Sequence, residues 1–81
     1  MAQNDVLDRV ISVTARVLDL DPNTIQADSN FVFDLGAESS QSVELVASFE
    51  EEFGIEMDED AALAVSTVNG AAEFIAKHLN R

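Results

Sequence analysis

The chain has 81 residues, 47% of them apolar, and its sixteen acidic and four basic residues give a formal net charge of −12. A chain of this length can bury one modest core and has no room for a large enzyme cleft, so we expect one domain over residues 1–81. Because the excess negative charge repels nucleic acid and anionic membranes, it favours proteins with basic surface patches as partners.

Cysteine is absent, which excludes a disulfide framework, a thiolate nucleophile and cysteine metal ligands. No apolar run reaches the length of a membrane span, and no basic segment is followed by the apolar stretch of a secretory signal. We therefore expect a cytoplasmic protein without a membrane span. We also expect a monomer.

The first segment has the apolar spacing of an amphipathic helix. Residues 1–4 are expected to fray, and either Asn4 or Asp5 is expected to cap the helix, which runs to about Leu18. The residues expected on its buried face are Val6, Val10, Val13 and Val17, widened by Leu7, Ile11 and Leu18.

A long connection from Asp19 to Ala37 follows, and it contains the only proline, Pro22. So long a segment without an element is unusual in a small domain, so we expect its own apolar side chains to anchor it. Three of these alternate as in a strand, but no second strand is available for pairing, and we therefore expect an extended, anchored loop. The candidate anchors are Ile25, Phe31, Phe33 and Leu35.

A turn at Gly36 leads into a second predicted helix, which begins near Ser39 and ends at Phe53. Gly54 stands just past that end, where a glycine C-cap is common. A helix N-terminus has unsatisfied N–H groups and partial positive charge, so a serine there can hold an attached phosphate, although most such serines serve only as caps. The expected buried face is Val43, Val46, Phe49 and Phe53.

The rest of the chain predicts a short helical patch over Ala61–Val65 and then a final helix. Ser66 or Thr67 is expected to cap the final helix, and Phe74 is expected beside its apolar face. That face consists of Val68, Ala72, Ile75 and Leu79. Three longer helices, one short helix and a long first loop make a small all-α four-helix bundle.

Two neighbouring stretches resemble the acyl carrier protein family, whose signature is D-L-G-x-D-S-L before an acidic helix. They are residues 34–40, DLGAESS, and residues 43–53, VELVASFEEEF. In that family a phosphopantetheinyl transferase attaches 4′-phosphopantetheine from coenzyme A to the motif serine, and the terminal thiol of this arm carries acyl groups as thioesters. The resemblance implies that Ser39 is the attachment site and that the chain is a carrier, not an enzyme.

The resemblance also implies partners, namely the transferase and the acyl-transferring and synthase enzymes, which would dock through basic patches. The absence of cysteine agrees with a carrier, because no protein thiol competes with the thiol of the cofactor. No metal site and no nucleic-acid partner is expected. The acidic docking residues that the resemblance implies are Glu38, Glu44, Glu50 and Glu51.

Some departures from the family pattern bear on the pathway. Ser40 replaces the leucine that usually follows the modified serine, and Phe33 replaces a polar residue. Ala61, Leu63 and Ala64 stand where charged residues are frequent. These departures favour a specialised carrier for a polyketide, secondary-metabolite or modified-lipid pathway, with fatty acid biosynthesis as the next candidate. The acyl group, its length and whether the core encloses it stay open.

Two other classes of function also stay open. One is a helical adaptor that has no cofactor and binds basic protein partners, and Ser40 keeps it in consideration. The other is a calcium-binding module, because Asp19–Asn23 imitates the first half of an EF-hand loop. Thr24 and Asn30 then stand where that loop requires a glycine and a bidentate glutamate, so the match fails in its second half.

Overall fold

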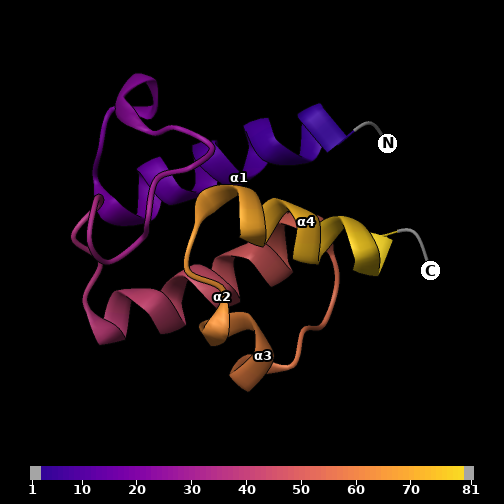
Figure 1. The fold of residues 1–81 in the computed structure, drawn as a ribbon. Coiled ribbons are helices and arrows are strands. Elements are labelled where there is room, and N and C mark those ends of the chain that lie inside the picture. The colour runs from indigo at the N-terminus through magenta and orange to yellow at the C-terminus, as the bar shows by residue number, and fades with distance from the viewer. Residues whose placement is uncertain (1–2, 80–81) are drawn as a thin grey trace.

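The computed structural model describes the backbone of residues 3–79 and the side chains of residues 5–79. Within that part of the chain, three longer helices and one short helix form a bundle, which confirms the all-α fold predicted from the sequence (Figure 1). The elements are α1 (Gln3–Leu18), a short 3₁₀ turn η1 (Pro22–Thr24), α2 (Ser39–Phe53), α3 (Glu59–Ala64) and α4 (Val68–Leu79).

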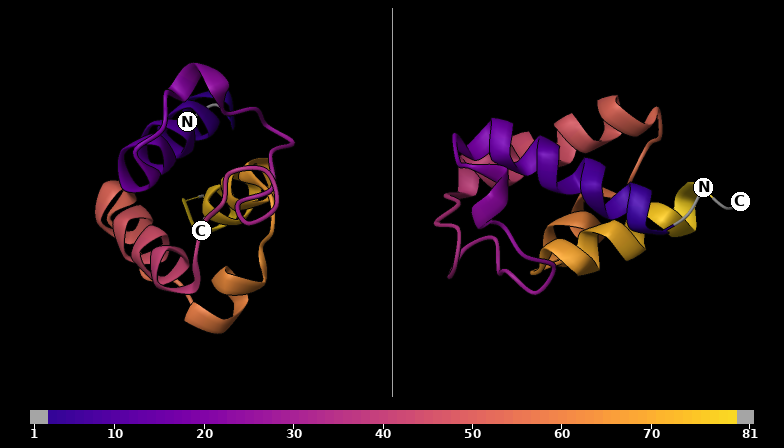
Figure 2. Two further views of the ribbon diagram at one scale, coloured as in Figure 1. Left: turned by 90° about the vertical axis from the view of Figure 1, so that its left-hand side faces the viewer. Right: turned by 90° about the horizontal axis from the view of Figure 1, so that it is seen from above.

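The three longer helices enclose the core. Viewed along the bundle, α1, α2 and α4 surround a common centre, α1 packs against both of the others, and α3 lies at the edge against α2 (Figure 2). None of the helices described is both long enough and apolar enough to cross a bilayer. One polar residue lies at the centre, Thr14, and its hydroxyl donates to the carbonyl oxygen of Val10 at 2.7 Å. The largest fully buried side chains are Val6, Val10, Val13, Thr14, Val68 and Ile75.

α1 begins earlier than the sequence predicted. It starts at Gln3, so Asn4 and Asp5 are helical residues and the predicted cap by either of them is wrong. No glycine or proline stops the helix here, and the acidic Asp5 stabilises its first turn through the helix dipole. The expected fraying concerned residues 1–4, of which the last two are helical and the first two lie outside the described residues. Of the predicted face, Val6, Val10 and Val13 are buried, and Leu7, Ile11, Val17 and Leu18 are partly buried.

The buried face of α2 differs from the predicted one at its first turns. Val43 was expected inside and is 46% exposed, whereas Leu45, which was not predicted, is 3% exposed. α2 contacts both α1 and α3, so its buried residues extend around more of the helix than one row at helical spacing. Val43 lies outside this buried face. The helix ends as predicted, with Gly54 in the left-handed region at φ 64°. The buried residues of α2 are Leu45, Val46, Phe49 and Phe53.

The last two helices are capped by side chains. α3 begins at Glu59, before the predicted Ala61, because Oδ1 of Asp58 accepts a hydrogen bond from the N–H of Asp60 at 3.0 Å. For α4, Oγ1 of Thr67 accepts from the N–H of Gly70 at 3.0 Å, which confirms one of the two predicted caps. The buried residues of α4 are Val68, Ala71, Ala72 and Ile75, and Leu79 is partly buried.

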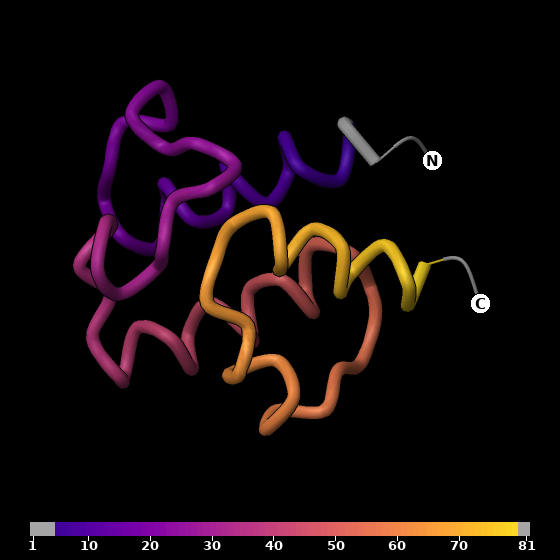
Figure 3. The backbone as a smooth tube through the Cα atoms, viewed as in Figure 1, coloured from indigo at the N-terminus to yellow at the C-terminus, as the bar shows by residue number. Residues whose placement is uncertain are grey.

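The connection between α1 and α2 is an anchored loop without a strand, as predicted, but it is folded into turns against the start of α4 and is not extended. The N–H of Val68 donates to the carbonyl oxygen of Ser29, and the N–H of Phe31 donates to that of Ser66, both at 3.0 Å. The tube in Figure 3 shows this segment crossing to α4 and returning to the start of α2. Backbone hydrogen bonds to the start of α4 therefore hold residues 27–31 of this connection, and its other backbone hydrogen bonds close local turns.

Two of the four predicted loop anchors are buried and one is not anchored at all. Ile25 and Phe31 are buried, and Leu35 packs partly buried against the core. Phe33 is 88% exposed, so its prediction as an anchor is wrong. The reason is that residues 31–35 form turns and not a strand, so alternate side chains do not share a face.

Arg9 joins α1 to the C-terminal end of α2. Its Nε donates to Oε2 of Glu52 at 3.0 Å, and its Nη2 donates to the carbonyl oxygen of the same residue at 2.8 Å. The guanidinium also lies over the ring of Phe53, 4.4 Å from the ring centroid. One cation of a strongly acidic chain thus binds two consecutive residues of α2.

We expect Arg9→Ala to lower the free energy of unfolding by about 2 kcal/mol, because it removes charge-assisted hydrogen bonds and a cation–π contact. Arg16→Ala is the matched control, because Arg16 is exposed on the same helix and its loss changes the net charge equally. We expect Arg16→Ala to lower the free energy of unfolding by no more than about 0.5 kcal/mol, because it removes only the interaction of one charge with the helix dipole. Urea denaturation followed by circular dichroism measures both values, and equal losses would contradict this role of Arg9.

Candidate functional site

Ser39 is the first residue of α2 and directly follows the residue that caps the helix. Glu38 occupies the N-cap position in an extended conformation, and its N–H donates to Oε1 of Gln41 at 2.9 Å. The N–H of Ser42 donates to the carbonyl oxygen of Glu38 at 2.9 Å and so begins the helical pattern. Because Glu38 and Gln41 form a capping box, the helix does not need the hydroxyl of Ser39 as its cap.

The hydroxyl of Ser39 is exposed and unbonded. Within the described part of the chain, residues 3–79, no group forms a hydrogen bond with it. The interpretation of this serine as a mere cap is therefore wrong. The start of α2 contributes partial positive charge and unsatisfied N–H groups, so a phosphodiester on this oxygen fits the site.

A closed turn fixes where α2 begins. The N–H of Ala37 donates to the carbonyl oxygen of Phe31 at 2.8 Å, and both residues are buried. Gly36 adopts φ 73°, a left-handed conformation that costs little only for glycine. Ser39 comes two residues after this closure, so the core residue Phe31 determines the place of the exposed hydroxyl.

Two polar side chains, those of Asn30 and Asp34, hydrogen-bond to the backbone of the same turn. Oδ1 of Asn30 accepts hydrogen bonds from the N–H groups of Val32 and Phe33, both at 2.9 Å. Oδ2 of Asp34 accepts from the N–H of Asn30 at 2.7 Å. The sequence analysis missed these roles, although Asn and Asp are known to bond to nearby backbone in turns.

The four acidic residues predicted to dock partners differ in how they are placed. Glu38, Glu44 and Glu51 are exposed. Glu50 is partly buried, and its Oε2 accepts a hydrogen bond from the N–H of Met57 at 2.8 Å. The carboxylates of Glu44 and Glu51 are thus available to a partner along α2, whereas the exposed Glu38 also caps the helix and Glu50 holds the segment after it.

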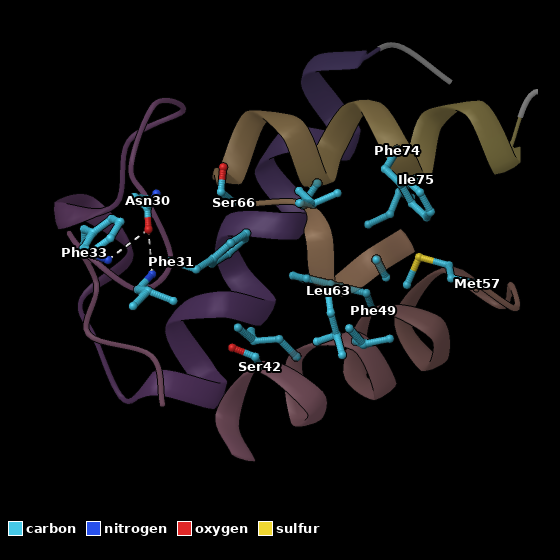
Figure 4. A pocket seen from close by; sticks show the side chains of 16 residues that line it. Asn30, Phe31, Phe33, Ser42, Phe49, Met57, Leu63, Ser66, Phe74 and Ile75 are labelled. Carbon is cyan, nitrogen blue, oxygen red and sulfur yellow. Dashed lines mark hydrogen bonds between the residues drawn. The ribbon is translucent and has the colours of Figure 1, made fainter. Parts of the chain in front are cut away.

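A cavity of about 250 Å³ lies among α2, α3 and α4. Its lining is mostly apolar, with Asn30 and Phe33 at one end and Met57 at the other (Figure 4). Sequence analysis assigned some of the lining residues, such as Val46, Phe49 and Ile75, to buried helix faces and missed the cavity, because helical spacing shows which side chains turn inward and not whether they fill the space. Its apolar lining includes Leu45, Val46, Phe49, Leu63, Phe74 and Ile75.

The segment that imitates a calcium loop forms a local turn. Oδ1 of Asp21 accepts from the N–H of Asn23 at 2.9 Å, and the hydroxyl of Thr24 donates to the carbonyl oxygen of Asp21 at 2.6 Å. Across residues 3–79, no three His, Asp or Glu side chains lie close enough together to hold a metal ion. The side chain of Asp21 therefore acts as the N-cap of η1.

The family described as "Phosphopantetheine attachment site" matches residues 8–75. The chain belongs to this family. Curated relatives include the acyl carrier protein of Phenylobacterium zucineum, 46% identical over 76 residues that cover 94% of this chain and 96% of the relative. The acyl carrier protein of Caulobacter vibrioides is 46% identical over 72 residues, or 89% and 92% of the two chains. That of Prochlorococcus marinus is 41% identical over 75 residues, or 93% and 94%.

Membership of the phosphopantetheine family confirms the resemblance seen in residues 34–53. It confirms 4′-phosphopantetheine as the cofactor and a carrier role instead of an enzymatic one. The relatives are acyl carrier proteins, in agreement with the predicted acyl carrier function, and nothing in the comparisons favours an adaptor or a calcium-binding module.

The stability of two variants tests the difference between a cap and an exposed hydroxyl. We expect Ser39→Ala to change the free energy of unfolding by less than about 0.5 kcal/mol, because the removed oxygen has no partner. Thr67→Ala is the matched control at the start of α4, where the removed oxygen accepts a bond from Gly70, and it should cost about 1 kcal/mol. Thermal or urea denaturation measures both, and a loss at Ser39 as large as that at Thr67 would restore the cap interpretation.

Proposed function

We propose that Ser39 is the residue that receives 4′-phosphopantetheine and that residues 1–81 act as one carrier domain. The observation that carries the proposal is the exposed, unbonded hydroxyl at the start of a helix already capped by Glu38. The Ser39 oxygen attacks the pantetheine-linked phosphorus of coenzyme A, a P–O bond to serine forms, adenosine 3′,5′-bisphosphate leaves, and the transferase takes up the hydroxyl proton. When bound, the arm supplies a thiol that carries acyl groups as thioesters.

The negative charge at and near α2 supports partners that have basic surfaces. Exposed Glu38, Glu44 and Glu51 suit enzymes with basic docking patches, namely the transferase and the acyl-transferring and synthase enzymes. Glu50 was also predicted for docking, and its bond to Met57 supports a smaller part for it. A cytoplasmic location and a monomeric state stay predictions.

The pathway is the least constrained part of the proposal. Candidates are fatty acid, polyketide and specialised lipid biosynthesis. Exposed Phe33 and Leu63, together with Ser40 after the modified serine, support a specialised carrier, because these side chains change the surface that every partner meets.

Intact mass spectrometry tests the attachment site. The purified chain, incubated with coenzyme A and a broad-specificity phosphopantetheinyl transferase, should gain the mass of one phosphopantetheine. Ser39→Ala should abolish the gain, and Ser40→Ala, the matched control at the next position, should keep it. If the Ser39→Ala chain still gains this mass, the attachment site is another residue. If the wild-type chain gains no mass, the chain is not modified and the adaptor function is favoured.

The cavity suits the end of an acyl chain. A dry, apolar engineered cavity of about 150 Å³ takes up benzene, so the cavity of about 250 Å³ has room for a longer stretch of methylene groups. Each methylene that moves from water into it contributes about 0.8 kcal/mol. An acyl chain that enters the cavity therefore stabilises the core, and the core stabilises the bound acyl chain.

Melting temperatures of the acylated chain test this placement. We expect the melting temperature to rise with acyl length until the cavity is full, at roughly eight to ten carbons by comparison with benzene. Ala62→Phe fills part of the cavity and should remove the dependence on length. Ala61→Phe is the matched control on the same helix, because Ala61 is exposed and outside the lining. A melting temperature independent of acyl length in the wild-type chain would exclude an enclosed cargo.

A further inference from the structure

Phe33 is the most exposed of the large apolar side chains described. It is 88% exposed, against 53% for Val32, 46% for Val43 and 40% for Leu63. A single exposed apolar residue is common on protein surfaces and by itself needs no explanation. Three further observations indicate that Phe33 binds a partner. They are its hydrogen-bonded backbone, its position in the chain and the charged residues around it.

The backbone that carries Phe33 is held in a turn by hydrogen bonds. Its N–H is bonded to Oδ1 of Asn30 at 2.9 Å, and the N–H of the next residue, Asp34, donates to the carbonyl oxygen of Asn30 at 3.0 Å. The N–H of Gly36 donates to the carbonyl oxygen of Val32 at 3.1 Å. An aromatic side chain on a preorganised turn loses little conformational entropy when a partner binds it, and such residues are favoured binding hot spots.

The closed turn limits how far Phe33 can lie from the reacting serine. The hydrogen bond between Ala37 and Phe31 closes the turn, Phe33 lies two residues after one end of it, and Ser39 lies two residues after the other. Two residues span at most about 7 Å of chain. A protein that reaches the hydroxyl of Ser39 therefore approaches the surface on which Phe33 stands.

The charge around Phe33 selects the class of protein. Asp34, Glu38 and Glu44 are exposed around this start of α2. An enzyme that transfers phosphopantetheine must hold the phosphates of coenzyme A, for which arginine and lysine side chains are the usual ligands. Its active-site rim is therefore basic and complements these carboxylates. A second copy of the chain would bring a net charge of −12 against the same charge.

We propose that Phe33 is the docking anchor for the phosphopantetheinyl transferase that modifies Ser39, inserted into an apolar pocket with a basic border. The proposal rests on the proposed function of Ser39. It goes beyond that function by assigning the binding energy of the encounter to a residue outside the motif DLGAESS and outside the acidic face of α2.

Modification kinetics test the proposal. Initial rates are measured by intact mass with a broad-specificity transferase, saturating coenzyme A and increasing concentrations of the full chain. We expect Phe33→Ser to raise the KM for the chain at least about tenfold and to leave kcat within about twofold, and Phe33→Leu to restore most of the affinity. Asn23→Ser is the matched control, an exposed position of the same connection whose side chain forms no hydrogen bond within residues 3–79.

A second measurement separates docking from chemistry. Ser39→Ala cannot react, so calorimetric titration of Ser39→Ala and of Ser39→Ala with Phe33→Ser into the transferase measures binding alone. The Kd should rise by the same factor as the KM. Because Phe33 is exposed, Phe33→Ser should leave the melting temperature unchanged, which excludes unfolding as the cause of a higher KM.

The possible outcomes distinguish this inference from the proposed function. An unchanged KM and Kd for Phe33→Ser, with a wild-type chain that is modified normally, would overturn the docking role and leave Ser39 as the attachment site. A dimer in sedimentation that Phe33→Ser dissolves would also overturn it, because the side chain would then be covered by a second copy. No modification of the wild-type chain would reject the proposed function itself.

Discussion

The site depends first on the hydrogen bond between the N–H of Ala37 and the carbonyl oxygen of Phe31, at 2.8 Å. It joins the backbone of the buried residue Phe31 to that of Ala37, two residues before α2, and the left-handed conformation of Gly36 makes the closure possible. Without it, the backbone before α2 would be an open loop and the first residue of the helix would have no fixed place. The position of an exposed serine is thus set by the burial of a phenylalanine eight residues earlier.

The acidic residues of the chain divide into two groups by their contacts. Glu50 and Glu52 are engaged within the fold, one with the N–H of Met57 and the other with Arg9. Exposed carboxylates such as Glu44 lack such bonds within residues 3–79, and their mutual repulsion opposes the compact state. A chain with this charge loses some stability, and it gains selective attraction to basic partner surfaces in return.

Much of this arrangement could be predicted from the sequence. Helical periodicity located the helices and most of the core, and the motif around Ser39 indicated the family. Two of the errors arise because a periodic pattern leaves out the contacts that neighbouring elements and side chains make. Val43 is exposed because α2 packs on two neighbours, and Phe33 is exposed because the side chain of Asn30 winds its backbone into a turn. The cavity was beyond prediction, since it depends on how side chains from three helices meet.

If the cavity receives the cargo as proposed, it links the cargo to the stability of the carrier. By the cost of about 24 cal/mol per Å³ found for empty cavities in protein cores, a sealed and dry space of about 250 Å³ would cost about 6 kcal/mol. That is comparable to the whole stability of a small domain. The polar side chains of Asn30, Ser42 and Ser66 in the lining reduce this cost, because they let water enter part of the space. An acyl chain that entered the cavity, as proposed, would regain apolar contacts that the helices alone do not make, so the loaded carrier would be the better-packed state.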